Sequence, residues 1–436
     1  MQAIFYPEAA IVKNNSEAFS EPAHLRSAFF GGGVGGEGAG ARGRSAGPHL
    51  PGPPTPTLPA RGRERSHGPA PLSRQADLRY QAGMALTLTS LCDLAPLGFD
   101  MIIDARAPAE FADDHLPGAI SLPVLDDGER AQVGTIYKQL SPFSARKIGG
   151  ALVARNVAAH LEGPLADKTG GWRPLIYCWR GGQRSGSFAT ILAQVGWRTE
   201  TLTGGYKSWR RLVVGQLRDT DIASPVLLLD GNTGSGKTEL LALLAARGMQ
   251  VIDLEGLANH RGSLFGGRIG GQPSQKLFEN RLAQALAALD PVRPVVIEAE
   301  SSKVGDRVLP SRLWAAMSAA PRITIAAPVA ARADYLVRSY GDMIADGGVL
   351  AATIDKLRPL HATEVIAGWH AMAATGQFRD LAADLMARHY DPRYAKSRAA
   401  KGRIEQVVAA ATLSPQSLEA LAGEVEAAAL RLVGPR

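Results

Sequence analysis

The segment Gly231–Thr238 reads GNTGSGKT and matches the pattern G-x-x-x-x-G-K-[ST] at every fixed position. A short apolar run, Val226–Asp230, precedes it, and leucines at helical spacing follow it. This order of strand, glycine-rich loop and helix predicts an α/β domain with a parallel sheet, in which backbone N–H groups of the loop surround a phosphate. The residues expected to bind an anion or diphosphate are Gly231, Gly234, Gly236, Lys237 and Thr238, and the Thr238 hydroxyl also suits Mg2+.

Further apolar runs predict three more strands of this sheet, at Met249–Leu254, Pro294–Ala299 and Arg322–Ala327. Their alternation with helical segments favours a doubly wound parallel sheet. The loop after Met249–Leu254 should lie at the carboxyl edge, where ligands of such sheets bind. His260 and Arg261 are therefore candidates for holding a second anionic group, and the alternative is that both are ordinary surface-loop residues.

Glu298 ends the predicted strand at Pro294–Ala299, where the second motif of P-loop proteins usually has an aspartate. Two interpretations are equally supported. Glu298 is either a ligand of Mg2+ or water, or the ion-pair partner of Arg261 or Lys303.

A second constrained segment, Leu175–Ser185, reads LIYCWRGGQRS. It predicts a strand that ends at Cys178, a tight loop, and a helix whose N-terminus attracts an anion. The same field, together with the charges of Arg180 and Arg184, lowers the pKa of a thiol. We therefore expect a nucleophilic cysteine in an anion-binding cradle, with Cys178, Arg180 and Arg184 as catalytic residues. A buried structural cysteine is the less favoured alternative.

The spacing from Cys178 to Arg184 fits both Cys-x5-Arg phosphatases and rhodanese-type sulfurtransferases. The flanking segments distinguish the two. Ile102–Phe111 with His115–Ile120 resembles the first rhodanese signature, and Leu202–Trp209 resembles the second. A rhodanese-like domain is therefore expected, with Asp104 and Arg106 as structural braces rather than catalysts.

Two further regions combine basic residues with helical periodicity. The insertion 124–163 contains Lys138, Arg146 and Lys147, and the C-terminal region contains Arg398 after His389–Tyr394. Such patterns suit contacts with RNA phosphates, and they equally suit solvated amphipathic helices.

The chain is expected to comprise four parts. These are an N-terminal extension at 1–83, a rhodanese-like parallel-sheet domain at 84–218 with the helical insertion 124–163, a P-loop NTPase-like parallel-sheet domain at 219–345, and a helical region at 346–436. The extension is rich in Gly, Pro and Arg and lacks apolar periodicity. We interpret it as disordered, or as the result of a start codon assigned upstream of Met84. A basic tail that touches RNA is the alternative.

Bulk composition restricts the setting of the protein. The 436 residues include 48 Lys and Arg against 41 Asp and Glu, a net charge of +7 that permits an RNA partner. Cys92 and Cys178 are the two cysteines, which predicts no disulfide framework and a reducing, cytoplasmic location. No run approaches the length of a membrane span.

A rhodanese-like domain followed by a P-loop domain resembles the tRNA 2-selenouridine synthase family. The resemblance runs from about Met84 to Arg398 and is carried by Cys178–Ser185, Gly231–Thr238, Leu257–Gly266 and His389–Tyr394. It implies a tRNA substrate with 2-thiouridine at the wobble position, which is S-geranylated with geranyl diphosphate and then selenated with selenophosphate. Cys178 takes the place of the family's selenium-carrying cysteine.

The resemblance also implies a monomer without a tightly bound cofactor or membrane contact, with Mg2+ accompanying the diphosphate at Thr238 and Glu298. Lys138, Arg146, Lys147 and Arg398 become candidates for tRNA binding. Three alternatives remain open: a tRNA sulfurtransferase that uses ATP, a Cys-x5-Arg phosphatase with a kinase-like module, and a non-catalytic adaptor for phosphorylated ligands. Whether geranyl diphosphate or a nucleotide binds Gly231–Thr238 also stays open.

Overall fold

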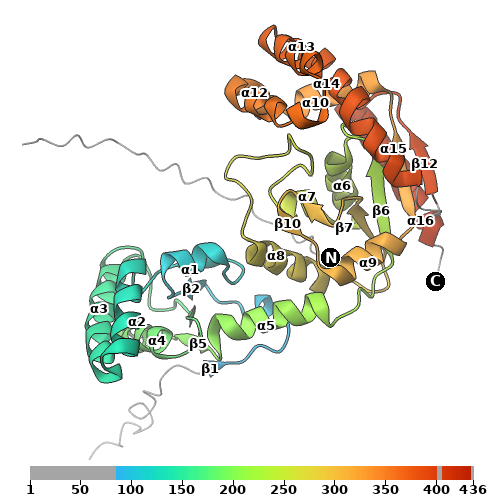
Figure 1. Ribbon diagram of the computed structural model, residues 1–436. Coiled ribbons are helices and arrows are strands. Elements are labelled where there is room, and N and C mark those ends of the chain that lie inside the picture. The colour runs from blue at the N-terminus through green and yellow to red at the C-terminus, as the bar shows by residue number, and fades with distance from the viewer. Residues whose placement is uncertain (1–84, 400–404, 434–436) are drawn as a thin grey trace, which may run out of the picture. The chain divides into compact units, whose positions relative to one another are not determined.

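The computed structural model describes residues 85–399 and 405–433, with side chains from 396 to 399 left out. The expectations for 1–83 and for the side chain of Arg398 lie outside the described residues. The expected α/β class is confirmed: the chain forms two parallel five-stranded sheets, and a largely helical region precedes the last strand of the second sheet (Figure 1).

The first sheet has the strand order β1-β5-β4-β2-β3, and every neighbouring pair is parallel. Its strands are β1 (Ala85–Leu86), β2 (Met101–Asp104), β3 (Ala119–Ser121), β4 (Pro174–Tyr177) and β5 (Glu200–Leu202). All four residues of β4 are buried, as expected of a central strand covered on both faces. The carboxyl end of β4 places Cys178 at the edge of the sheet where ligands of parallel sheets bind.

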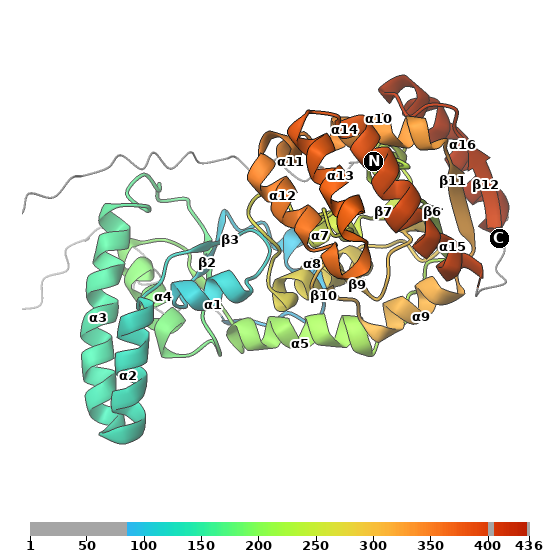
Figure 2. The ribbon, with the colours of Figure 1, turned by 45° about the horizontal axis from the view of Figure 1, so that its top comes forward.

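The helices of this part are α1 (Pro108–Asp113), α2 (Asp127–Gln139), α3 (Pro142–Glu162), α4 (Gln183–Val195) and α5 (Gly205–Arg218). The segment expected to form a helical insertion contains α2 and α3, which lie side by side (Figure 2). Val153 and Val157 of α3 pack with Ile176 and Phe188 in one apolar cluster, which anchors the insertion to the sheet.

The second sheet has the order β12-β11-β6-β8-β7, again with only parallel pairs. Its strands are β6 (Val226–Gly231), β7 (Gln250–Ile252), β8 (Val295–Glu298), β11 (Arg322–Ala326) and β12 (Glu405–Ala409). A short hairpin of β9 (Lys303–Val304) and β10 (Arg307–Val308) stands apart. The helices here are α6 (Lys237–Ala246), α7 (Leu254–Leu257), α8 (Gln275–Ala287), α9 (Ser311–Ala319) and α10 (Val329–Ser339).

The expected helical region follows α10 and has its own apolar core, which includes Ile354, Ile366, Trp369 and Leu381. Its helices are α11 (Gly341–Ala345), α12 (Gly347–Asp355), α13 (Thr363–Ala374), α14 (Phe378–Leu385) and α15 (Asp391–Ala399), with a π-helical turn at Met386–Tyr390. The chain then returns to the second sheet as β12 and ends in α16 (Pro415–Val433), which packs against α6.

No helix in the described part of the chain is both long enough and apolar enough to cross a membrane.

Candidate functional site

Cys178 follows β4 directly and faces the N-terminus of α4. The side chain is 3% exposed, and its Sγ accepts a hydrogen bond from the Ser185 hydroxyl at 3.2 Å. Burial alone raises the pKa of the thiol, but this effect is outweighed by hydrogen bonds from Ser185 and Gly182 and by the charge of Arg184, so the pKa of Cys178 is lowered. The arrangement favours a thiolate, the nucleophilic form of cysteine.

The loop after Cys178 is held by the first turn of α5. The backbone N–H of Tyr206 donates to the Cys178 carbonyl at 2.8 Å, and that of Lys207 donates to the Trp179 carbonyl at 3.0 Å. Gly205 allows this approach, since a Cβ at that position would lie 2.2 Å from the Cys178 carbonyl oxygen. This contact explains the second glycine of the Gly204–Gly205 pair in the second signature.

The two arginines of the Cys178 loop have different surroundings. Arg184 forms an ion pair with Glu110 of α1 at 2.7 Å, while Arg180 is exposed and has no ion-pair partner among the described residues. Arg106 donates to both carboxylate oxygens of Asp104 and, at 2.5 Å, to the carbonyl of Asp114. Arg106 and Asp104 therefore act as the structural braces that the sequence predicts.

A cavity of about 550 Å³ opens over the loop between β6 and α6. Lys237 lies on it and donates to the Gly231 carbonyl at 3.2 Å, while Thr238 donates to Glu255 at 3.0 Å. Gly234 has φ of 82°, a left-handed conformation that glycine adopts without strain. Burial disfavours the cation, but electrostatic interactions with Tyr394 first, and then with Glu255 and Glu300, outweigh this effect and raise the pKa of Lys237, which keeps this side chain cationic.

Three glutamates lie close to the cradle: Glu255 and Glu300 line the cavity, and Glu298 is buried next to them. Burial and the neighbouring charge of Glu255 raise the pKa of Glu300 to about 8 and that of Glu298 well above its ordinary value. Glu298 is fully buried, accepts from the backbone N–H of Glu255 at 2.5 Å, and leaves its second carboxylate oxygen without a partner. A neutral, protonated Glu298 fits these surroundings.

The sequence offers two roles for Glu298, a ligand of Mg2+ or water and an ion-pair partner, and the structure shows what surrounds this side chain. Glu298 does not line the cavity, and it pairs with neither Arg261 nor Lys303 among the described residues. Its hydrogen bond positions the backbone of Glu255 instead. Thr238 and Glu255 are two hydrogen-bonded oxygen donors of the cavity lining, which also includes Glu300, and hard oxygen donors of this kind fit Mg2+. Within the described ranges, no group of three or more His, Cys, Asp or Glu side chains is arranged to hold a metal.

The loop after α7 contributes cations to the cavity. Arg261 lines it, pairs with Asp342 at 2.8 Å and lies over the ring of Tyr340 with its Cζ 4.6 Å from the centroid. His260 does not line the cavity, and its buried Nδ1 has no hydrogen-bond partner. Arg268 also lines the cavity, and sequence reasoning missed it because no motif marks that position.

An apolar pocket adjoins this cavity and shares four lining residues with it, namely Thr233, Ser263, Leu336 and Tyr340. The remaining lining comes mainly from the helical region, including Phe378, Leu381, Ala382, Leu385 and Met386. Its exposed lining is almost wholly hydrocarbon, so a phosphate cradle and an apolar pocket lie next to each other.

The basic residues of the insertion lie apart from both loops in the sequence. Lys138 lies on α2, and Arg146 and Lys147 lie on α3; all three are exposed. Exposed apolar side chains accompany them at Tyr137 and Phe143. Exposure suits contact with a large charged partner, and it also suits a solvated helix, so both interpretations of these residues stand.

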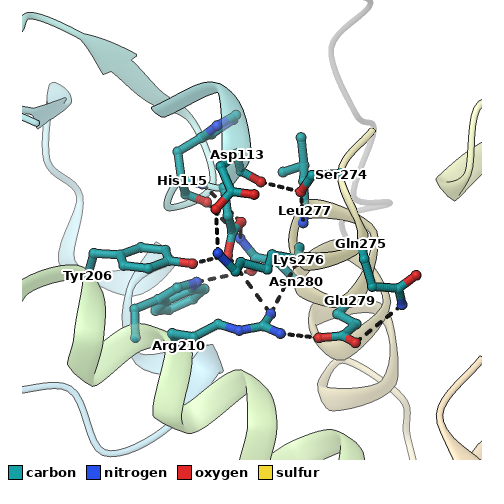
Figure 3. A network of polar contacts seen from close by, with 12 residues as sticks. Asp113, His115, Tyr206, Arg210, Ser274, Gln275, Lys276, Leu277, Glu279 and Asn280 are labelled. Atoms are coloured by element: carbon teal, nitrogen blue, oxygen red, sulfur yellow. Dashed lines mark hydrogen bonds and ion pairs between the residues drawn. The ribbon is translucent and has the colours of Figure 1, made fainter. Parts of the chain in front are cut away.

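A polar network connects α8 with α5 and with the segment that follows α1 (Figure 3). Asn280 of α8 donates to Asp114 at 2.7 Å and accepts from the Trp209 indole at 3.0 Å. The other carboxylate oxygen of Asp114 accepts from the Tyr206 hydroxyl at 2.7 Å. Because Tyr206 also binds the Cys178 carbonyl, α8 helps to fix the position of the loop after Cys178.

These two sites define a class of protein in which a rhodanese-like cysteine domain is joined to a P-loop domain. A model of the rhodanese-like domain matches residues 90–212, and a model described as the tRNA 2-selenouridine synthase AAA domain matches residues 224–353.

Similar proteins agree with these matches. A tRNA 2-selenouridine synthase of Aeromonas salmonicida is 40% identical over 260 residues, which covers 58% of this chain and 68% of that protein. One from Hahella chejuensis is 38% identical and covers 55% and 63%, and one from Cupriavidus pinatubonensis is 35% identical and covers 68% and 77%. The chain belongs to the tRNA 2-selenouridine synthase family.

Proposed function

We propose that this protein converts wobble 2-thiouridine of tRNA into 2-selenouridine, by S-geranylation with geranyl diphosphate followed by selenation with selenophosphate. The observation that carries the proposal is the apolar pocket next to the phosphate cradle. A ligand with a diphosphate head and a hydrocarbon tail fits this pair of sites. A nucleotide with its phosphates in the cradle would place its polar ribose without hydrogen-bond partners in the apolar half.

In the first step, the sulfur of 2-thiouridine attacks C1 of the geranyl group. A carbon–sulfur bond forms, the carbon–oxygen bond to diphosphate breaks, and the diphosphate leaves with the electron pair while the uridine N3 proton is released. Lys237, Arg261 and the backbone N–H groups of the loop neutralise charge that grows on the leaving group. Mg2+ held by Thr238 and Glu255 would add positive charge at the same place.

In the second step, selenium of selenophosphate attacks C2 of the modified ring. A carbon–selenium bond forms, geranyl thiolate leaves with the electron pair, and water cleaves the phosphorus–selenium bond to give phosphate. We assign this step to the cradle of Cys178, since its helix N-terminus and Arg180 suit the anionic group of selenophosphate and its thiol has a lowered pKa.

The proposal is tested with a stem-loop RNA carrying 2-thiouridine, the purified protein and geranyl diphosphate, followed by mass spectrometry of the nucleosides. We expect S-geranyl-2-thiouridine, and 2-selenouridine once selenophosphate is added. A wild-type protein that leaves 2-thiouridine unchanged would overturn the proposal. ATP consumption coupled to sulfur transfer would instead favour the ATP-dependent sulfurtransferase.

The placement of geranyl diphosphate is tested separately by narrowing the apolar pocket. Ala382→Leu adds volume to the pocket lining, and the neighbouring Ala383→Leu on the same helix does not line the pocket and is the matched control. We expect Ala382→Leu to raise the KM for geranyl diphosphate about tenfold or more, by overpacking the site. Inhibition by inorganic diphosphate should stay unchanged, because that anion occupies only the cradle.

A further inference from the structure

A second surface pocket, of about 360 Å³, lies beside the loop of Cys178. We call it the Trp179 pocket; its lining includes Trp179, Tyr206, Lys207, Arg210, Arg211 and Lys276. It shares no lining residue with the P-loop cavity or with the apolar pocket next to that cavity. Neither step of the proposed function uses it so far.

The aromatic part of the Trp179 pocket is exposed and held in place. Trp179 is 38% exposed, and its ring centroid lies 5.3 Å from that of Tyr206. The guanidinium of Arg106 supports both rings, with its Cζ 4.1 Å from the Tyr206 centroid and 6.0 Å from the Trp179 centroid. A large aromatic ring fixed at the surface, one residue after the reactive cysteine, is suited to stacking with a planar ligand.

The charged part of the pocket contains both paired and unpaired cations. Arg210 pairs with Glu279, and Lys276 pairs with Asp113 at 2.5 Å (Figure 3). Lys207 and Arg211 are exposed and have no ion-pair partner among the residues that the structure describes. These two side chains are therefore available to bind anions next to the aromatic ring.

We infer that the Trp179 pocket binds the nucleotide to be modified, with its base stacked on Trp179 and its flanking phosphates on Lys207 and Arg211. Single-stranded RNA is recognised by this combination of aromatic stacking and phosphate contacts. Trp179 directly follows Cys178, so a base stacked there is held by the same loop that carries the thiol. The identity of the RNA rests on the proposed function, whereas the class of ligand, an unpaired nucleotide, rests on the pocket.

Photo-crosslinking locates the nucleotide. A stem-loop RNA with 5-iodouridine at the wobble position is bound to the full-length protein, irradiated, digested and mapped by mass spectrometry. We expect the crosslink on Trp179 or Tyr206, and we expect Trp179→Leu to abolish it at Trp179. A crosslink confined to α2, α3 or the helical region, with RNA still bound, would overturn the inference.

Binding measurements separate stacking from charge. Trp179→Leu should weaken the affinity for the stem-loop roughly fivefold to 150-fold, the range for one base stacked on an aromatic side chain, whereas Trp179→Phe should retain most of it. Lys207→Ala and Arg211→Ala should each flatten the dependence of log affinity on log salt by about 0.7. The control Arg312→Ala, an exposed cation paired with Asp221, should leave the salt slope unchanged. Equal affinities for Trp179→Leu and wild type would contradict the inference.

The outcomes also distinguish this inference from the proposed function. If wild type makes 2-selenouridine and Trp179→Leu crosslinks and binds as wild type does, the inference is wrong and the proposed function stands. If wild type makes no modified nucleoside but crosslinks at Trp179, the nucleotide site stands and the proposed function is wrong. A phosphopeptide that displaces the RNA from wild type and binds tighter than it, with that binding lost in Trp179→Leu, would assign the pocket to a protein partner and overturn the inference.

Discussion

The reactivity of Cys178 depends on neighbours that act against its burial. Burial disfavours the thiolate, while Ser185, Gly182 and Arg184 stabilise it. Arg184 cannot act as a free anion receptor in this arrangement, because its guanidinium is also bound to Glu110. We therefore assign Arg184 to tuning the thiol, and Arg180, which is exposed, to contact with an incoming anion.

This division predicts the pH dependence of Cys178 alkylation. A lowered pKa means that thiolate is present at a lower pH, so the rate should rise with a midpoint below the ordinary value for cysteine. Arg184→Gln should move that midpoint upward, since it removes a charge that stabilises the thiolate. The rate is measured with iodoacetamide in a Cys92→Ser background, with Arg180→Gln as the comparison. An unchanged midpoint in Arg184→Gln would show that hydrogen bonds alone set the pKa.

At the scale of the elements, α8 connects two parts of the chain through side chains that no motif marks. Asn280 is buried, and its amide bonds to Asp114 and to the carbonyl of His115 at 2.6 Å (Figure 3). Burial raises the pKa of Asp114, because its carboxylate is stabilised only in part by Tyr206 and Asn280. Removing one partner from such a network leaves the others buried without hydrogen bonds.

Asn280→Leu should therefore lower the free energy of unfolding by about 3 kcal/mol, since it removes buried hydrogen bonds at nearly constant volume. Urea denaturation measures the change. Arg312→Ala, which breaks an exposed ion pair with Asp221, is the control and should change stability by no more than about 0.5 kcal/mol. A similar small effect of Asn280→Leu would mean that water replaces the amide without cost.

The helical region contains a histidine, His389, whose pKa is lowered by its surroundings. His389 is buried, its Nδ1 lies 3.0 Å from Nε2 of His361, and its Nε2 lies 2.8 Å from Nη1 of Arg393. Burial, followed by the charges of Arg393 and His361, lowers the pKa of His389 to about 4. The unfolded chain binds this proton at the ordinary pKa of 6.5, so between 6.5 and 4 the unfolded state binds more protons.

The free energy of unfolding should accordingly fall as the pH is lowered from 6.5 towards 4. His389→Gln should flatten this part of the profile, whereas His370→Gln, on α13 and paired with Asp355, should keep the wild-type slope. Chemical denaturation at a series of pH values measures the slope. The same slope in His389→Gln and wild type would assign the acid sensitivity to other groups.

Sequence reasoning succeeds where a motif and its flanks describe one local unit. The strands β4 and β6 and their loops are such units, and Lys237 and Thr238 line the cavity that the motif predicts.

Sequence reasoning fails where the fold brings distant segments together. Glu255 lies in the four-residue helix α7 without any motif, yet it bonds to Thr238. β12 was missed because Val408 is its single buried residue, too weak a pattern to identify an edge strand.

At the scale of the whole molecule, the Cys178 loop and the P-loop cavity belong to different sheets. Each has the groups suited to one of the two proposed steps, selenation and geranylation respectively. The loop after β4 holds a thiol of lowered pKa, and the loop after β6 holds a diphosphate cradle with an apolar neighbour. If each site serves one step, variants of the two sites must accumulate different nucleosides. This expectation tests the division of labour rather than the overall reaction.

Cys178→Ala should still geranylate and then stop, so S-geranyl-2-thiouridine accumulates, whereas Lys237→Ala should leave 2-thiouridine unreacted. The loss of geranylation in Lys237→Ala should reach about 3 kcal/mol, or roughly a hundredfold in rate, because Lys237 neutralises charge on the diphosphate as it leaves. Supplying pre-geranylated RNA should restore selenation in Lys237→Ala and not in Cys178→Ala. Mass spectrometry of the nucleosides distinguishes these products. If Cys178→Ala, with wild-type stability and RNA binding, leaves 2-thiouridine unreacted, the thiol takes part in geranylation and the assignment of one step to each domain is wrong.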